Sequence, residues 1–167
     1  MRRFVLTAFL CLLPMTASAG CYNAEQLEAE QGLRIHSELM IIALNCQHLA
    51  STGVLLNKQY EKFTQNNLDL IQGYENTMRA VFASEGKGNG EKELNTFRTA
   101  LANRIANEAV RLQPNVFCQA YGGRIVQASG MSREKFRKWT QTVFPGYPLT
   151  HQVCSGVLVA TQAAPQH

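Results

Sequence analysis

The sequence predicts an all-α protein, a disulfide-tied up-down bundle of four to five helices with a proline-punctuated C-terminal tail. Apolar residues recur every three to four positions from about residue 24 to residue 142, which is the spacing of amphipathic helices rather than of strands. Four cysteines follow an export signal, which indicates disulfides. Residues 144–149 (Phe-Pro-Gly-Tyr-Pro-Leu) cannot continue a helix, because proline lacks an amide donor and restricts the residue before it.

Residues 1–19 have the three parts of a secretory signal. Arg2 and Arg3 begin it, an apolar run spans residues 4–13, and residues 17–19 (Ala-Ser-Ala) form a cleavage site. The apolar run is shorter than the roughly 20 residues that cross a bilayer. We therefore expect cleavage near Ala19, no transmembrane segment in the mature chain, and a periplasmic or secreted location.

A lipoprotein signal is the alternative, with Cys21 acylated after cleavage. Ser18 stands where such signals usually carry an apolar residue. Acylation would also leave three cysteines, one of them unpaired, which is uncommon in exported proteins. Ordinary secretion is therefore the preferred interpretation.

The mature chain would have 148 residues with 14 basic and 12 acidic side chains. This length fits one domain, which we expect to comprise a bundle over residues 20–143 and a tail over residues 144–167 packed on it. A net charge of +2 is too small to indicate nucleic-acid binding.

The first helix is expected over residues 24 to about 49, with Asn23 as its cap and Gln26 as the capping-box partner. Residues 39–44 are apolar on all sides, so this half should be buried. A second helix follows, carrying Tyr60, Phe63 and Asn67 and running to about residue 82. The residues expected to be best buried are Leu39, Met40, Leu44, Phe63, Leu70 and Val81.

A glycine-rich loop at residues 84–90 precedes a third helix over about residues 94–112, which Pro114 should end. Asn115 is expected to cap a fourth helix that ends near Gly130. Ser132 should cap a short basic helix, with Phe136 and Trp139 on its inner face and its four basic residues in water.

Helix geometry favours one of the three possible cysteine pairings. A continuous first helix, at about 1.5 Å per residue, places Cys21 and Cys46 roughly 35 Å apart, whereas a disulfide needs its Cα atoms within about 7 Å. An up-down topology brings Cys118 to the Cys46 end and returns Cys154 to the Cys21 end. We therefore predict Cys46–Cys118 and Cys21–Cys154.

The search for catalytic and metal-binding motifs gives little. His36 and Met40 share a helical face, a spacing that could present nitrogen and sulfur to copper, but His48 lies about 18 Å further along the axis. We expect core packing instead, with no metal site, no cofactor and no catalytic motif. Glu38 could act as a helix-borne acid, although we expect it either to lie on the solvent side of the helix or to pair with a neighbour such as Arg34, one turn earlier.

Four residues are candidates for lining a ligand pocket. Asn67 lies in an otherwise apolar stripe, and Asn103 stands beside Leu101 in the third helix. Each could either specify helix packing or contact a ligand. Phe144 and Tyr147 could form an ordered lid, if the tail returns along the bundle to Cys21.

The segment Glu38-Leu39-Met40, followed by Ala43-Leu44-Asn45-Cys46, resembles a group of small exported proteins of Gram-negative, mostly alphaproteobacterial, bacteria. Their E-L-M-x-x-A-L-x-C helix precedes a Y-x-x-F helix, an L-A-N segment and an F-C pair. The corresponding residues here are Tyr60 to Phe63, Leu101-Ala102-Asn103 and Phe117-Cys118. The resemblance implies a helical periplasmic protein without known chemistry, and it does not cover the chain beyond about residue 125.

Taken together, these features predict a periplasmic structural or binding module. Its partner would be an unidentified protein or small-molecule ligand in that compartment. The alternative is a small periplasmic enzyme acting on cell-wall glycan through a helix-borne carboxylate. An exposed binding surface would favour the module, whereas a concave pocket with convergent acid and base groups would favour the enzyme.

Overall fold

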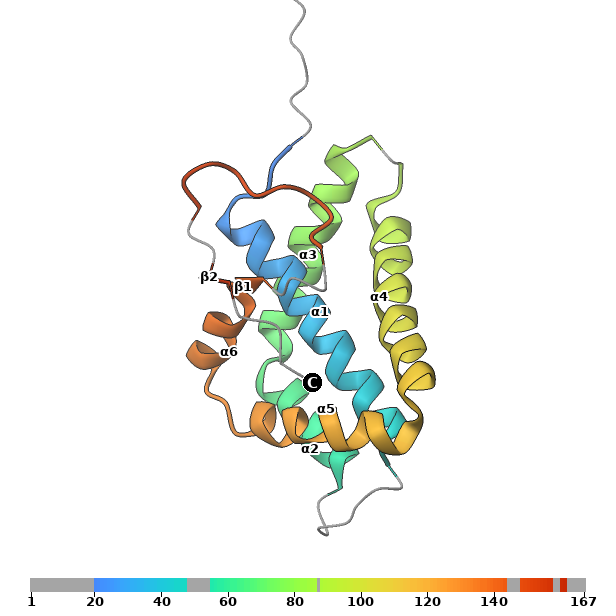
Figure 1. The fold of residues 1–167 in the computed structure, drawn as a ribbon. Helices are drawn as coiled ribbons and strands as arrows, with labels where there is room; N and C mark the ends of the chain where they lie inside the picture. The colour runs from blue at the N-terminus through green and yellow to red at the C-terminus, as the bar shows by residue number, and fades with distance from the viewer. Residues whose placement is uncertain (1–19, 48–54, 87, 144–147, 158–159, 162–167) are drawn as a thin grey trace, which may run out of the picture.

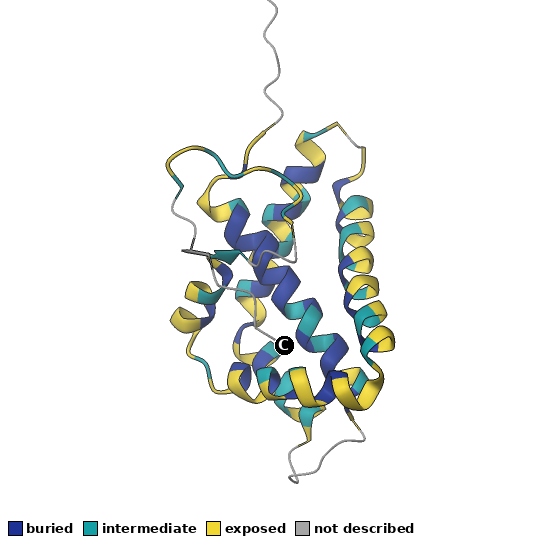
Figure 2. Cartoon of the chain, in the orientation of Figure 1, coloured by how far each residue is buried: buried dark blue, intermediate teal, exposed yellow. Residues whose placement is uncertain are grey.

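Helix α1 (Ala24–Asn45) lies at the centre of the computed structural model and contacts all of the other helices (Figure 1). Its side chains are buried on most sides from Leu27 to Ala43, as Figure 2 shows. The prediction that the first helix is buried along its second half is therefore confirmed, and burial extends into its first half as well.

The structure describes residues 20–47, 55–86, 88–143, 148–157 and 160–161. Within these ranges the fold is all-helical apart from two two-residue strands, which pair in parallel. The elements that follow α1 are α2 (Leu56–Asn66), α3 (Leu68–Ser84), α4 (Gly90–Leu112), α5 (Pro114–Ser129), α6 (Arg133–Thr140), β1 (Thr142–Val143) and β2 (Ala160–Thr161). The predicted fold class, a disulfide-tied helical bundle, is confirmed.

Helices α1, α3 and α4 alternate in direction, as expected of an up-down bundle (Figure 1). Helix α5 instead runs across the end of the bundle where α1 and α4 finish. It packs against α2 and α1 and thereby closes that end of the core.

The predicted second helix is two helices in the structure, because the chain breaks at Asn67. This residue ends α2 and begins α3, with φ −124° and ψ 15°. Its side chain is buried and donates from Nδ2 to the Phe63 carbonyl oxygen, at 2.9 Å. The side-chain hydrogen bond holds the last turn of α2 while the backbone changes course, so a polar residue occupies this buried position.

Two of the three predicted helix caps are confirmed. Asn23 and Gln26 form the capping box of α1, and Ser132 accepts the Lys135 amide at the start of α6. The prediction for Asn115 was wrong. Gln113 is the cap, and helix α5 begins two residues earlier than predicted, with Pro114, whose missing amide proton costs nothing at the first helical position.

The core residues follow the prediction in part. Leu39, Phe63 and Val81 are buried, but Met40 and Leu70 are only partly buried. The prediction for Leu44 was wrong, because 56% of this residue is exposed. Cys46 is turned inward to its disulfide partner, and a residue two positions away points to nearly the opposite side of a helix.

Both predicted disulfides are present. Cys21 and Cys154 have Cα atoms 4.9 Å apart, and those of Cys46 and Cys118 are 5.5 Å apart. Two disulfides are typical of proteins outside the reducing cytoplasm. The Cys21 sulfur is bonded to Cys154 and so cannot carry a lipid thioether, which argues against the lipoprotein alternative. None of the described helices combines the length and apolar character that a membrane crossing requires.

Candidate functional sites

A shallow depression lies on the solvent-facing side of α4. Its lining consists mainly of amide and hydroxyl side chains, with one carboxylate and one ammonium group. The lining residues are Asn89, Glu91, Lys92, Asn95, Thr96, Thr99, Ala100 and Asn103. We call this surface the α4 face. Most of its residues recur at intervals of three and four, so they share one side of the helix, which Figure 2 shows as exposed.

The amphipathic pattern of α4 explains this orientation. Leu94, Leu101 and Ile105 are buried against the rest of the bundle, and α4 contacts α1, α3 and α5. The opposite side therefore faces water. Exposed helix surfaces are usually rich in Lys and Glu, but the middle of the α4 face, from Asn95 to Asn103, consists of uncharged lining residues.

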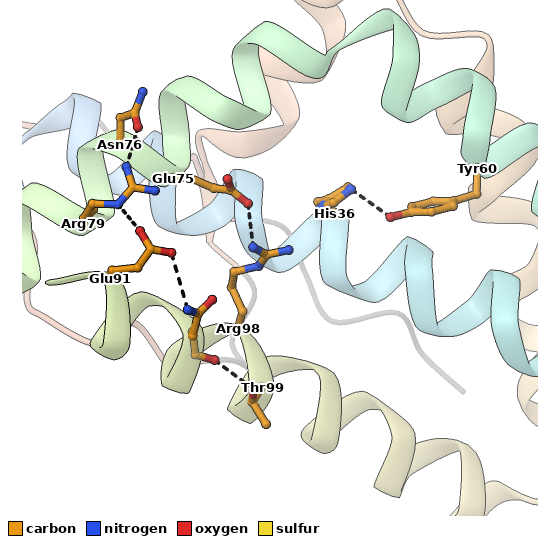
Figure 3. A network of polar contacts seen from close by, with 9 residues as sticks. His36, Tyr60, Glu75, Asn76, Arg79, Glu91, Arg98 and Thr99 are labelled. Atoms are coloured by element: carbon orange, nitrogen blue, oxygen red, sulfur yellow. Dashed lines mark hydrogen bonds and ion pairs between the residues drawn. The ribbon is translucent and has the colours of Figure 1, made fainter. Parts of the chain in front are cut away.

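Ion pairs from α3 hold the first half of α4 in place (Figure 3). Arg79 pairs with Glu91 at 2.5 Å, and Arg98 pairs with Glu75 at 2.9 Å. Asn95 extends this network by donating to the second carboxylate oxygen of Glu91, at 3.4 Å. These ion pairs fix the position of the α4 face relative to α3.

The hydroxyl groups of the α4 face are oriented by the helix itself. Thr96 donates to the Lys92 carbonyl oxygen at 3.0 Å, and Thr99 donates to the Asn95 carbonyl oxygen at 2.8 Å. Each hydroxyl proton is thus used within the helix, which leaves the oxygen lone pairs as acceptors. The neighbouring Asn side chains add both donors and acceptors.

The two predicted pocket residues that the structure describes, Asn67 and Asn103, do not come together. Asn103 lines the α4 face, whereas Asn67 is buried at the α2–α3 junction and is not part of that lining. Phe144 and Tyr147 lie outside the described residues. Of the two roles considered for Asn67, the structure supports helix packing.

A second cluster of polar groups surrounds Glu38, between α1, α4 and α5. The Glu38 carboxylate lies 2.5 Å from the Arg124 guanidinium, and only 14% of its side chain is exposed. Burial raises the pKa of Glu38 to about 7; Arg124 opposes this shift, and the nearby Glu108 carboxylate adds to it. Glu108 also accepts the Tyr121 hydroxyl at 2.8 Å. The expected pairing of Glu38 with Arg34 was wrong.

The His36 side chain contacts Tyr60 of α2. Its Nε2 lies 2.8 Å from the Tyr60 hydroxyl (Figure 3), and the two rings are stacked. Burial, together with the charge of Arg98, lowers the pKa of His36 to about 4. In the part of the chain that the structure describes, no three His, Cys, Asp or Glu side chains are grouped to hold a metal ion.

Sequence reasoning missed two further buried carboxylates on α1. Glu28 accepts hydrogen bonds from the Tyr74 hydroxyl and from Arg137, each at 2.8 Å. Burial raises its pKa, but the hydrogen bonds from Arg137 and Tyr74 outweigh this effect and lower the pKa below its usual value. Glu30 is fully buried and pairs with Arg34 at 2.5 Å. A central helix leaves little room for exposed charge, so its charged residues had to be buried and paired.

Three of the four basic residues of α6 have carboxylate partners. Phe136 on its inner face is fully buried and Trp139 is partly buried, as predicted. On the outer side, Arg133 pairs with Asp69, Arg137 with Glu28 and Lys138 with Glu134. These three cations therefore already have carboxylate partners.

Comparisons of the chain with protein-family models, with curated proteins and with solved structures found no match.

Proposed function

We propose that the protein is an exported binding module of the periplasm, and that its ligand is a neutral, hydroxyl-rich molecule such as a glycan strand. The observation that carries this proposal is the α4 face, a shallow and open surface whose lining residues are mainly asparagines and threonines. Such side chains can both donate hydrogen bonds to sugar hydroxyls and accept them. The resemblance to small exported helical proteins and the signal-like residues 1–19 support the location.

The distribution of ionisable groups supports binding rather than catalysis. Glu28 and Glu38 each pair with an arginine from another helix, and Glu30 is bonded to Arg34 and to the Thr150 amide. These buried carboxylates tie elements together. None of them lines the α4 face.

One observation favours the alternative of a small enzyme acting on cell-wall glycan. The pKa of Glu38, about 7, suits a general acid at neutral pH. Against this role, the carboxylate is held by Arg124 and is largely buried. Catalysis would require Glu38 to leave that pair and reach a substrate.

Binding to purified cell-wall sacculi tests the proposal. Cosedimentation should retain the wild-type protein, and the double substitution Thr99→Ala with Asn103→Ala should weaken retention at least about tenfold. Alanine suits the helix interior, so the fold should persist. Gln72→Ala on the exposed side of α3 is the matched control and should bind as wild type. Equal retention of the double variant and the wild type, or no retention of either, would contradict the proposal.

The same assay separates binding from catalysis. A binding module leaves the sacculi intact, whereas an enzyme releases soluble fragments. Release by the wild type that is lost in Glu38→Gln would establish the enzyme alternative. The export part is checked independently by producing the full chain with its own N-terminus and sequencing the mature protein, which should begin at Gly20.

A further inference from the structure

Residues 148–157 run beside the N-terminal part of α1, and we call them the strap. Backbone hydrogen bonds join it to Tyr22, just before the helix. The Tyr22 amide donates to the Gln152 carbonyl oxygen at 2.7 Å, and the Cys154 amide donates to the Tyr22 carbonyl oxygen at 2.9 Å. Tyr22 and Val153 thereby form a parallel bridge, and the Cys21–Cys154 disulfide lies beside it.

The strap covers a buried ion pair of α1. Glu30 is fully buried, and one of its oxygens accepts the Thr150 amide at 3.0 Å. Arg34, which is bonded to Glu30, also donates to the Pro148 carbonyl oxygen at 2.9 Å. The Nη1 atom of Arg34 is buried and has no hydrogen-bond partner among the described residues. The strap therefore keeps a charged pair out of water.

The two disulfides differ in accessibility. Cys46 and Cys118 are 1% and 7% exposed and belong to the core. Cys21 is exposed and Cys154 is partly exposed. Thiol–disulfide exchange requires a thiolate to approach a sulfur directly. Because Cys21 is the most exposed of the four cysteines, we expect an external thiolate to attack there.

We propose that Cys21–Cys154 is a redox latch, which a dithiol opens while Cys46–Cys118 stays closed, releasing the strap and exposing Glu30 and Arg34. The dithiol, as one thiolate, attacks the Cys21 sulfur, and Cys154 leaves as a thiolate that takes up a proton. The second thiol of the reductant then displaces Cys21 from the mixed disulfide. The reductant ends as a disulfide and the protein gains two thiols, so electrons and protons balance.

The remaining contacts of the strap are suited to reversible opening. Glu30 and Arg34 are four residues apart on α1 and bonded to each other, so they stay paired when the strap leaves. The apolar strap residues Leu149, Val153 and Val157 are only partly buried. His151, which lies 2.5 Å from Glu85, would pass from a partly buried position into water. Opening therefore leaves the buried Glu30–Arg34 pair intact, and an unpaired buried charge at that pair would have been the main cost.

Stepwise reduction of the folded wild-type protein with dithiothreitol tests the order of opening. Alkylation followed by mass spectrometry should label Cys21 and Cys154 at least about tenfold faster than Cys46 and Cys118. Hydrogen exchange of the same sample should show the Thr150 and Cys154 amides exchanging at least about tenfold faster after reduction. The buried amides of α1 beyond the strap should keep their protection.

Paired variants provide the control. Cys21→Ser with Cys154→Ser should reproduce the fast exchange of the strap without any reductant, whereas Cys46→Ser with Cys118→Ser should leave the strap protected. Should either variant not fold, the wild-type reduction still decides the question. Earlier or simultaneous reduction of Cys46–Cys118, or an unchanged Thr150 exchange rate once Cys21–Cys154 is open, would overturn the proposal. Neither result depends on ligand binding at the α4 face.

Discussion

Glu38 of α1 and Arg124 of α5 form an ion pair at 2.5 Å in which both side chains are mostly buried. The pair joins the central helix to the helix that crosses the end of the bundle. Burial nevertheless raises the pKa of Glu38 to about 7, so the desolvation of the carboxylate outweighs the attraction of Arg124. The tie between α1 and α5 therefore depends on pH near neutrality.

The raised pKa of Glu38 predicts how stability changes with pH. In the unfolded chain this carboxyl loses its proton near pH 4.5, whereas in the folded protein it keeps it to about pH 7. The folded state binds more protons in this window, so the free energy of unfolding should fall as pH rises from 4.5 to 7, by on the order of 3 kcal/mol. Denaturant unfolding of wild type and Glu38→Gln across this range isolates the effect, because other titrating groups such as His36 contribute equally to both proteins. The free energy of unfolding of the wild type should fall relative to that of the variant as pH rises. A parallel decline in both proteins would show that Glu38 does not titrate as described.

His36, two residues earlier, should have the opposite effect. Its pKa is lowered from 6.5 to about 4 in the folded protein, so its contribution to stability is present above pH 6.5 and is lost as pH falls toward 4. The loss should be about 3 kcal/mol at most. Unfolding of wild type and His36→Gln across this range should isolate the contribution of His36 to stability. The imidazole resonances of His36 should titrate near pH 4. A titration near 6.5 would contradict the prediction.

Gly32 is a close-approach position between α1 and α3. A Cβ atom there would collide with the ring of Tyr74, which is buried and donates its hydroxyl to Glu28. Gly32→Ala should therefore cost about 1–3 kcal/mol through overpacking.

Gly73 provides the matched control, since it is exposed within α3 and an added Cβ meets no described atom within 4 Å. Gly73→Ala should stabilise the helix by about 0.5–1 kcal/mol. Chemical denaturation measures both changes. Equal effects of the two substitutions would mean that Tyr74 does not pack on Gly32.

Leu39 and Leu44 test the orientation of α1. Leu39 is fully buried and Leu44 is 56% exposed. Leu39→Ala should cost about 2–5 kcal/mol, through lost transfer free energy and a cavity, whereas Leu44→Ala should cost less than about 0.5 kcal/mol. Thermal melts show which of the two variants is less stable. A larger loss of stability for Leu44→Ala than for Leu39→Ala would mean that α1 is rotated about its axis.

The candidate site on α4 was predictable only in part. Asn103 was singled out beside Leu101, but Asn95, Thr96 and Thr99 were not. Their spacing with Asn103 places them on one side of the helix. This spacing could have identified the polar face from the sequence. The anchoring pairs Arg79–Glu91 and Arg98–Glu75 join two helices, and no local pattern identifies such partners.

The sequence by itself determined what depends on nearby residues and on helix dimensions. The Asn23–Gln26 and Ser132 caps, the stop at Pro114 and the all-helical class follow from interactions within a few residues. The cysteine pairing also followed, because the length of α1 keeps Cys21 away from Cys46 and an up-down topology brings Cys118 to the Cys46 end.

Only the tertiary structure decided the break at Asn67, the crossing of α5 and the exposure of Leu44. It also chose the partners of the buried carboxylates, as Glu28 meets Arg137 and Glu38 meets Arg124 from distant parts of the chain. A buried charge requires a partner, but which partner reaches it depends on how whole helices pack against one another. That packing is the sum of many small contacts across the bundle, and no single stretch of sequence contains it.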